Sequence, residues 1–158
     1  MADAASERTS PWGETLQEAN EMGERLRADG WEVVTVRAGH VAPFPPDRGD
    51  ADRSGLVFVA PDDVADGLRA AVDGADLTDY EVFRRQVGSD LFVLVRLTDA
   101  DARVAVLLVG AVDLATAGPL REAARERGVL YSHVRLLDGT HLAIFRHDDP
   151  TAVFPSPS

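Results

Sequence analysis

The feature that most constrains the fold is a run of three strand-like segments between Tyr80 and Gly110. The segments read YEVFRRQV, LFVLVRLT and RVAVLLVG, and the connections GSD and DADA have the length of β-hairpin turns. We therefore predict an antiparallel meander. The third segment is almost entirely apolar, which indicates a central strand with both faces covered.

Three other segments carry apolar residues at helical spacing and end at a glycine. Ser10 is a suitable cap for the first, with Pro11 as the first helical residue and Gly30 as its end. The second ends at Gly74 and the third at Gly128. We expect amphipathic helices that pack against the sheet.

Four more strands complete the predicted fold. Residues 31–37 and 56–60 are rich in β-branched and aromatic residues, and residues 38–55 between them are expected to form a long loop. The last two strands form a hairpin at Asp138 and Gly139. The sequence predicts an α+β fold whose mostly antiparallel sheet, a meander plus a C-terminal hairpin, packs with about three helices in the order α-β-β-α-β-β-β-α-β-β.

The length suits one domain. With 45% hydrophobic residues the chain can bury a core, which we place in a single domain at residues 10–148. Residues 1–9 are expected to be disordered, and residues 149–158 to form a largely disordered tail.

The longest apolar run, Val104 to Val112, is shorter than the ~20 residues of a membrane span. We expect a soluble, cytoplasmic protein without membrane association.

The charged residues are unusual in kind. The net charge is −11, and the chain has sixteen arginines, no lysine, and eighteen aspartates against nine glutamates. This composition is typical of proteins that work in multimolar salt, where the Debye length is about 3 Å or less. The acidic surface is then a solubility device, and the lack of a basic stripe argues against nucleic-acid binding.

The segment RGDADRSGLVF resembles the start of an EF-hand calcium loop. Asp50, Asp52 and Ser54 occupy the first, third and fifth ligand positions, and Gly55 occupies the turn position. However, Pro61 stands where the bidentate glutamate is required, and a strand rather than a helix follows Gly55. We predict a hydrated acidic loop and no calcium site.

The last hairpin contains three of the four histidines. A two-residue turn would pair Leu136 with His141, which puts His141 and His147 on one face, roughly 20 Å apart, and His133 on the other. Because ligands must lie about 2 Å from a shared ion, we predict no metal site. With no cysteine, the chain also lacks thiolate ligands, and we predict no cofactor.

His40 is a candidate for a catalytic residue. It follows a predicted strand and precedes a carboxylate-rich loop, where Asp47, Asp50 or Asp52 could orient it as a general base. No G-x-S-x-G, H-E-x-x-H, Walker or G-x-G-x-x-G motif accompanies it. A solvated histidine is the simpler interpretation.

Arg84 and Arg85 are candidates for an anion-binding site. They lie on the first meander strand with Tyr80 nearby, and a guanidinium group can bind an anion with two hydrogen bonds. The simpler interpretation is that one arginine pairs with surface carboxylates and the other shields the sheet.

Three segments of the chain resemble a family of small haloarchaeal proteins of unknown function. They read GWEVVTVRAGHVA, YEVFRRQVGSDLFVLVRL and AVLLVGAVDLATAGPLREAARERGVLYSHVRLLDGTHLAIFRHDDP. The resemblance covers Trp12 to about Phe154. It implies a single domain adapted to high salt, and it implies no activity, cofactor or catalytic residue.

We therefore expect a non-enzymatic cytoplasmic module that binds a protein partner or itself, as a homodimer. The reasons are the lack of a catalytic motif and the number of strands, which leaves sheet edges to be paired or covered. The alternative is a small hydrolase or ligand-binding enzyme with a pocket under residues 39–55.

Overall fold

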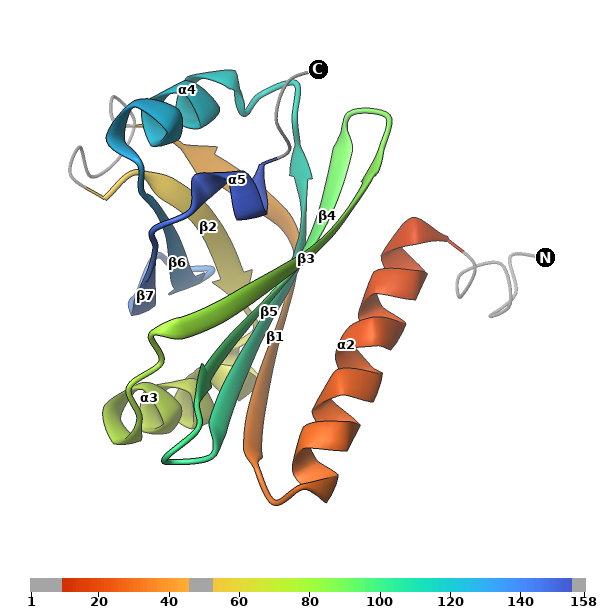
Figure 1. The fold of residues 1–158 in the computed structure, drawn as a ribbon, viewed down its shortest axis with the longest axis vertical. Coiled ribbons are helices and arrows are strands. Elements are labelled where there is room, and N and C mark those ends of the chain that lie inside the picture. The colour runs from red at the N-terminus through yellow and green to blue at the C-terminus, as the bar shows by residue number, and fades with distance from the viewer. Residues whose placement is uncertain (1–9, 46–52, 155–158) are drawn as a thin grey trace.

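The computed structural model describes residues 10–45 and 53–154, which are built on one seven-stranded sheet (Figure 1). The strands are β1 (Glu32–Phe44), β2 (Gly55–Ala60), β3 (Asp79–Val87), β4 (Asp90–Asp99), β5 (Val104–Asp113), β6 (Leu130–Leu136) and β7 (His141–His147). The helices are α2 (Pro11–Ala28), α3 (Ala65–Gly74), α4 (Gly118–Arg127) and α5 (Pro150–Val153), with a 3-10 turn, η1 (Asp62–Val64), before α3.

The strand order corrects the predicted fold class. The order is β3-β4-β5-β1-β2-β6-β7, in which β1–β5 and β2–β6 are parallel pairs and the remaining neighbours are antiparallel. The protein is α+β, but its sheet is mixed, and the described residues contain four α-helices instead of about three. Short connections indicate only which consecutive strands pair, whereas the parallel pairs join strands that are distant in sequence.

The first strand is longer than predicted. β1 continues to Phe44, so residues 38–44 belong to the sheet and not to the expected loop. A register shift between Arg37 and Gly39, where Gly39 has a positive φ of 69°, marks a β-bulge that lets the strand continue. Beyond the bulge, residues 41–44 pair with β2.

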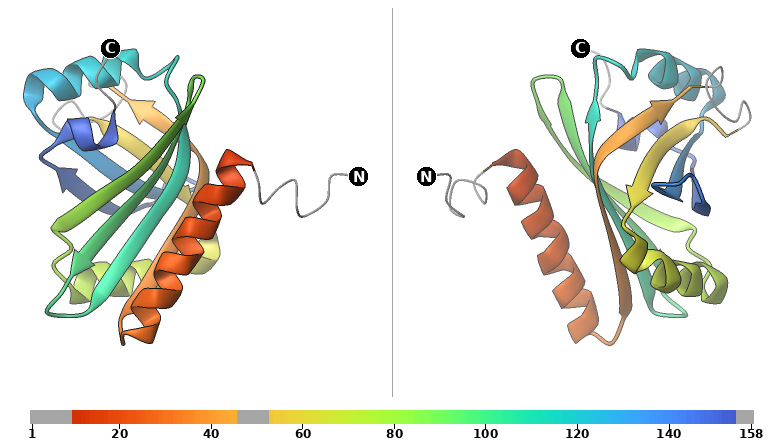
Figure 2. Two further views of the ribbon diagram at one scale, coloured as in Figure 1. Left: turned by 45° about the vertical axis from the view of Figure 1, so that its right-hand side comes forward. Right: turned by 180° about the vertical axis from the view of Figure 1, so that it is seen from behind.

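The sheet has a core on each face. On β5, Val106 and Leu108 face the larger core, while Leu107 and Val109 face a smaller one with residues of α2. Figure 2 shows α2 along one face of the sheet and the other helices on the opposite side. The prediction that this strand is covered on both faces is therefore confirmed.

The N-terminal helix begins as its sequence predicts. The Ser10 side chain accepts a hydrogen bond of 3.0 Å from the backbone N–H of Gly13, and Pro11 is the first helical residue.

None of the helices in residues 10–45 and 53–154 has both the length and the apolar character that crossing a membrane requires.

The C-terminal segment holds the two sheet edges together. The N–H of Asp149 donates to the Tyr80 hydroxyl at 2.9 Å, and Arg84 donates to the carbonyl of Thr151 at 2.5 Å. Val153 and Phe154 are buried. The hydrogen bonds and these two buried apolar side chains thus attach residues 149–154 to the core.

Candidate ligand pocket between the sheet edges

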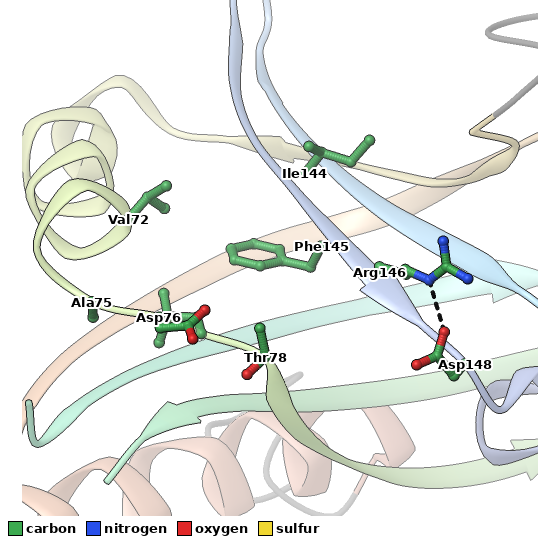
Figure 3. A pocket seen from close by; sticks show the side chains of 9 residues that line it. Val72, Ala75, Asp76, Thr78, Ile144, Phe145, Arg146 and Asp148 are labelled. Carbon is green, nitrogen blue, oxygen red and sulfur yellow. Dashed lines mark hydrogen bonds and ion pairs between the residues drawn. The ribbon is translucent and has the colours of Figure 1, made fainter. Parts of the chain in front are cut away.

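A pocket of about 350 Å³ lies where the two edge strands approach one another. One side is β7 and the residues after it, and the other is the segment that leads from α3 into β3 (Figure 3). The lining residues are Val72, Ala75, Asp76, Leu77, Thr78, Ile144, Phe145, Arg146 and Asp148. The volume is at the lower end of the range for small-ligand sites.

The interior of the pocket is apolar. In Figure 3 the Phe145 ring of β7 extends from its strand toward Val72 of α3. Leu77 and Phe145 also belong to the larger core, which fixes their positions by packing. A ligand that enters here would therefore meet a rigid apolar floor.

The rim of the pocket is polar and carries both signs of charge. Arg146 donates to Asp148 through Nε at 2.7 Å and to the Tyr131 hydroxyl at 3.3 Å. The hydrogen bond to Asp148 raises the pKa of Arg146 above its ordinary value. Across the pocket, the Asp76 carboxylate has no hydrogen-bond or ion-pair partner among the described residues.

Asp99 holds the Asp76 side of the pocket in place. Its Oδ2 accepts a hydrogen bond of 2.8 Å from the backbone N–H of Asp76. Its Oδ1 accepts from the N–H groups of Asp101 and Ala102 at 3.0 and 3.2 Å, as expected for an aspartate in a turn. These hydrogen bonds lower the pKa of Asp99, and the bond from Asp76 has the largest effect. The contact to Asp76 joins residues distant in sequence, and no sequence motif marks it.

The catalytic candidates are not brought together in the described residues. His40 lies on β1 with an exposed side chain, and it lines neither this pocket nor the second one described below. Asp47, Asp50 and Asp52 lie outside the described residues. The pairing of His40 with these aspartates, and a pocket under residues 39–55, remain predictions.

The two candidate anion-binding arginines point to opposite faces of β3. Arg85 forms ion pairs with Glu14 and, at 3.3 Å, with Glu18 of α2. Arg84 reaches Thr151 on the other side. A second pocket of about 200 Å³ beside them is lined by Thr15, Glu18, Phe83, Arg84, Arg85 and Phe92. An anion would have to compete with two carboxylates for Arg85, and anion binding remains a prediction.

A buried serine of β6 and a buried histidine of β7 contact each other. Ser132 Oγ and His147 Nε2 are 2.7 Å apart, and the ring of Tyr80 packs edge-on against His147. His147 is fully buried, and within the described residues its Nδ1 has no hydrogen-bond partner. Burial lowers the pKa of His147 to about 4. Both side chains are closed to solvent.

The other two hairpin histidines contact one another, contrary to prediction. Val134 pairs with Ala143 but Arg135 pairs with His141, so Leu142 is the extra residue of a β-bulge. The bulge turns His141 to the face of His133, and the ring centroids are 5.7 Å apart. The predicted pairing of Leu136 with His141 is therefore wrong. It assumed a regular hairpin, whereas the inserted residue moves His141 to the opposite face of the strand.

The fold and its pockets define an α+β protein with a curled mixed sheet, whose edge strands are linked by side chains and by α5. A family of unknown function, DUF7529, matches residues 1–155, and the chain belongs to this family. Searches of curated proteins and of solved structures found no match.

Proposed function

We propose that the protein is a non-enzymatic binding module that takes an extended protein segment into the pocket between β7 and the start of β3. The observation that carries this proposal is the position of the pocket beside β7, the terminal strand of the sheet. An edge strand presents unpaired backbone N–H and C=O groups, and extended segments bind to such edges as an added strand.

The side chains of the pocket favour a basic residue in the bound segment. The apolar floor of Val72, Leu77 and Phe145 suits the aliphatic stem of an arginine or lysine. The Asp76 carboxylate is available to its charged end, whereas Arg146 is already held by Asp148. Together these features support a segment with a cationic side chain over an acidic or purely apolar one.

A defined peptide tests this function. The blocked pentapeptide acetyl-VTRTV-amide would be titrated into labelled protein and followed by amide NMR. We expect shifts in residues 76–78 and 144–148, and binding about fivefold weaker when citrulline, which has the same shape without charge, replaces the arginine. Asp76→Asn should cause a similar loss. Asp90→Asn, at the start of β4 beside the far end of β3, should cause none.

Two results would contradict the proposal. One is the absence of shifts at the pocket at millimolar peptide. The other is equal affinity for propylguanidine and for the peptide, which would identify the site as one for small cations, without a contribution from the sheet edge.

We also propose that the protein works in the cytoplasm of a salt-loving cell and that a second copy of the chain is one source of the bound segment. The excess of aspartate and the absence of lysine support the first point, and the sixteen arginines support the second. Light scattering in about 2 M KCl, where long-range repulsion is screened, measures the mass. A concentration-dependent dimer that Asp76→Asn weakens is expected, and a strict monomer would exclude self-association.

A further inference from the structure

We propose that His133 and His141 form a two-imidazole chelate for a divalent first-row transition ion, such as Zn²⁺ or Cu²⁺. The site lies on the β6–β7 hairpin, on residues that the pocket does not use. Imidazole nitrogens are common ligands for both ions.

The separation of the two ring nitrogens is the first support for this site. His133 Nδ1 and His141 Nε2 are 3.5 Å apart, which is long for a hydrogen bond. Two nitrogens at about 2.05 Å from one tetrahedral ion are about 3.3 Å apart. In such a chelate the ring centroids would be about 5.2 Å apart, compared with 5.7 Å here. A small rotation of the exposed His141 ring supplies this difference.

The second support is the way in which His133 is oriented. Its Nε2 lies 2.7 Å from the backbone carbonyl of Arg53, and because a carbonyl only accepts, Nε2 carries the proton. In the tautomer with its single proton on Nε2, the lone pair is on Nδ1, the nitrogen that faces His141. A backbone carbonyl is one of the usual partners for the second nitrogen of a metal-binding histidine. His133 is 5% exposed, so packing also holds the ring.

Neighbouring charges determine how strongly the pair binds. Arg135, whose guanidinium lies 5.5 Å from the centre of the Phe44 ring, and Arg53 both act electrostatically on His141. Their positive charge opposes a dication, but it is strongly screened near 1 M salt. No group of three or more histidine, aspartate or glutamate ligands occurs among the described residues. Water would complete the coordination, and the site would be weaker than a structural zinc site.

The test uses the untagged chain with Zn²⁺ or Cu²⁺ alone, in about 1 M sodium nitrate to screen charge without chloride complexes. Calorimetry should give one ion per chain. Nitrogen NMR should show changes at His133 Nδ1 and His141 Nε2, and electron paramagnetic resonance of the Cu²⁺ form should show two equatorial imidazoles. A spectrum with one imidazole, or no binding at millimolar ion, would overturn the proposal.

Variants separate the chelate from a merely structural histidine pair. His141→Ala changes an exposed side chain and should abolish binding with the fold intact by circular dichroism. His40→Ala, an exposed histidine elsewhere, should bind as the parent does. Arg135→Gln should bind Cu²⁺ more tightly, because it removes a repulsive charge. Unchanged binding in His141→Ala, or weaker binding in Arg135→Gln, would overturn the proposal.

Discussion

Acidification should destabilise the protein through His147. Its folded-state pKa is about 4, below the ordinary 6.5, because the ring is buried and the charged form loses its hydration. Between these two values the unfolded chain binds a proton that the folded chain does not bind. The stability contribution is therefore fully present above pH 6.5 and is lost as the pH falls toward 4.

The size of the effect follows from the shift. A shift of about 2.5 units corresponds to about 3 kcal/mol in total, of which about 2 kcal/mol is already lost at about pH 5. This is a large part of the stability of a small domain. The buried Nδ1 adds to the effect, because in the protonated ring it would be a buried N–H donor with no acceptor among the described residues.

Denaturant unfolding of the parent and of His147→Gln, at about pH 7 and about pH 5, measures the difference. Glutamine keeps a polar group near Ser132 but does not titrate, and the carboxylates common to both proteins cancel. The parent should lose about 2 kcal/mol more than the variant between the two conditions. Ser132→Ala is the control: it removes the hydrogen bond and lowers stability, yet keeps the titrating ring and most of the extra loss.

The reasoning is refuted if His147→Gln loses as much stability as the parent on acidification. It is also refuted if proton NMR of the folded parent shows the His147 ring titrating near 6.5. Either result would mean that water or another group reaches the ring.

Three further predictions concern the fold and the pocket. Gly110→Ala should cost about 1–3 kcal/mol in denaturant unfolding, because an added Cβ would lie 2.1 Å from Val41 Cγ2. Gly67→Ala on α3 is its control, because the added Cβ would make only an ordinary contact of 3.8 Å with Val34 Cγ2, and it should gain about 0.5–1 kcal/mol. Ser10→Ala should lower stability by about 1 kcal/mol by removing the cap of α2, whereas Ser10→Asp should not. Asp99→Asn should speed hydrogen exchange at the amide of Asp76, because the amide group is a weaker acceptor than the carboxylate; unchanged exchange would show that Asp99 does not hold this side of the pocket.

Local features of the sequence predicted much of the fold. The meander, the Ser10 cap and the covered β5 follow from short connections, a capping residue and continuous apolar character, all of which act over a few residues. The parallel pairs β1–β5 and β2–β6 depend on which strands meet in the core. That choice is made by packing over the whole chain, and no local pattern encodes it.

The pocket was not predicted, for a related reason. Its residues come from α3, the segment before β3, and β7, and only the curling of the sheet brings them together. Asp76 and Asp148 stand among many aspartates, so neither is distinctive in sequence. The long-range contacts of Asp99 with Asp76 and of Tyr80 with Asp149 become visible only in the folded chain.

The two β-bulges decide where the histidines point. Strand side chains alternate between faces, so one extra residue exchanges the faces of everything beyond it. In β1, Val36 lies before the shift at Ala38 and Val41 lies after it, yet both face the larger core. A regular strand with Val36 inward would turn His40 inward as well, and the bulge instead leaves this histidine exposed.

In β7, Leu142 moves His141 away from the face of His147 and onto that of His133. The sheet thus separates the buried His147 from the His133–His141 pair, and this separation depends on one inserted residue, Leu142.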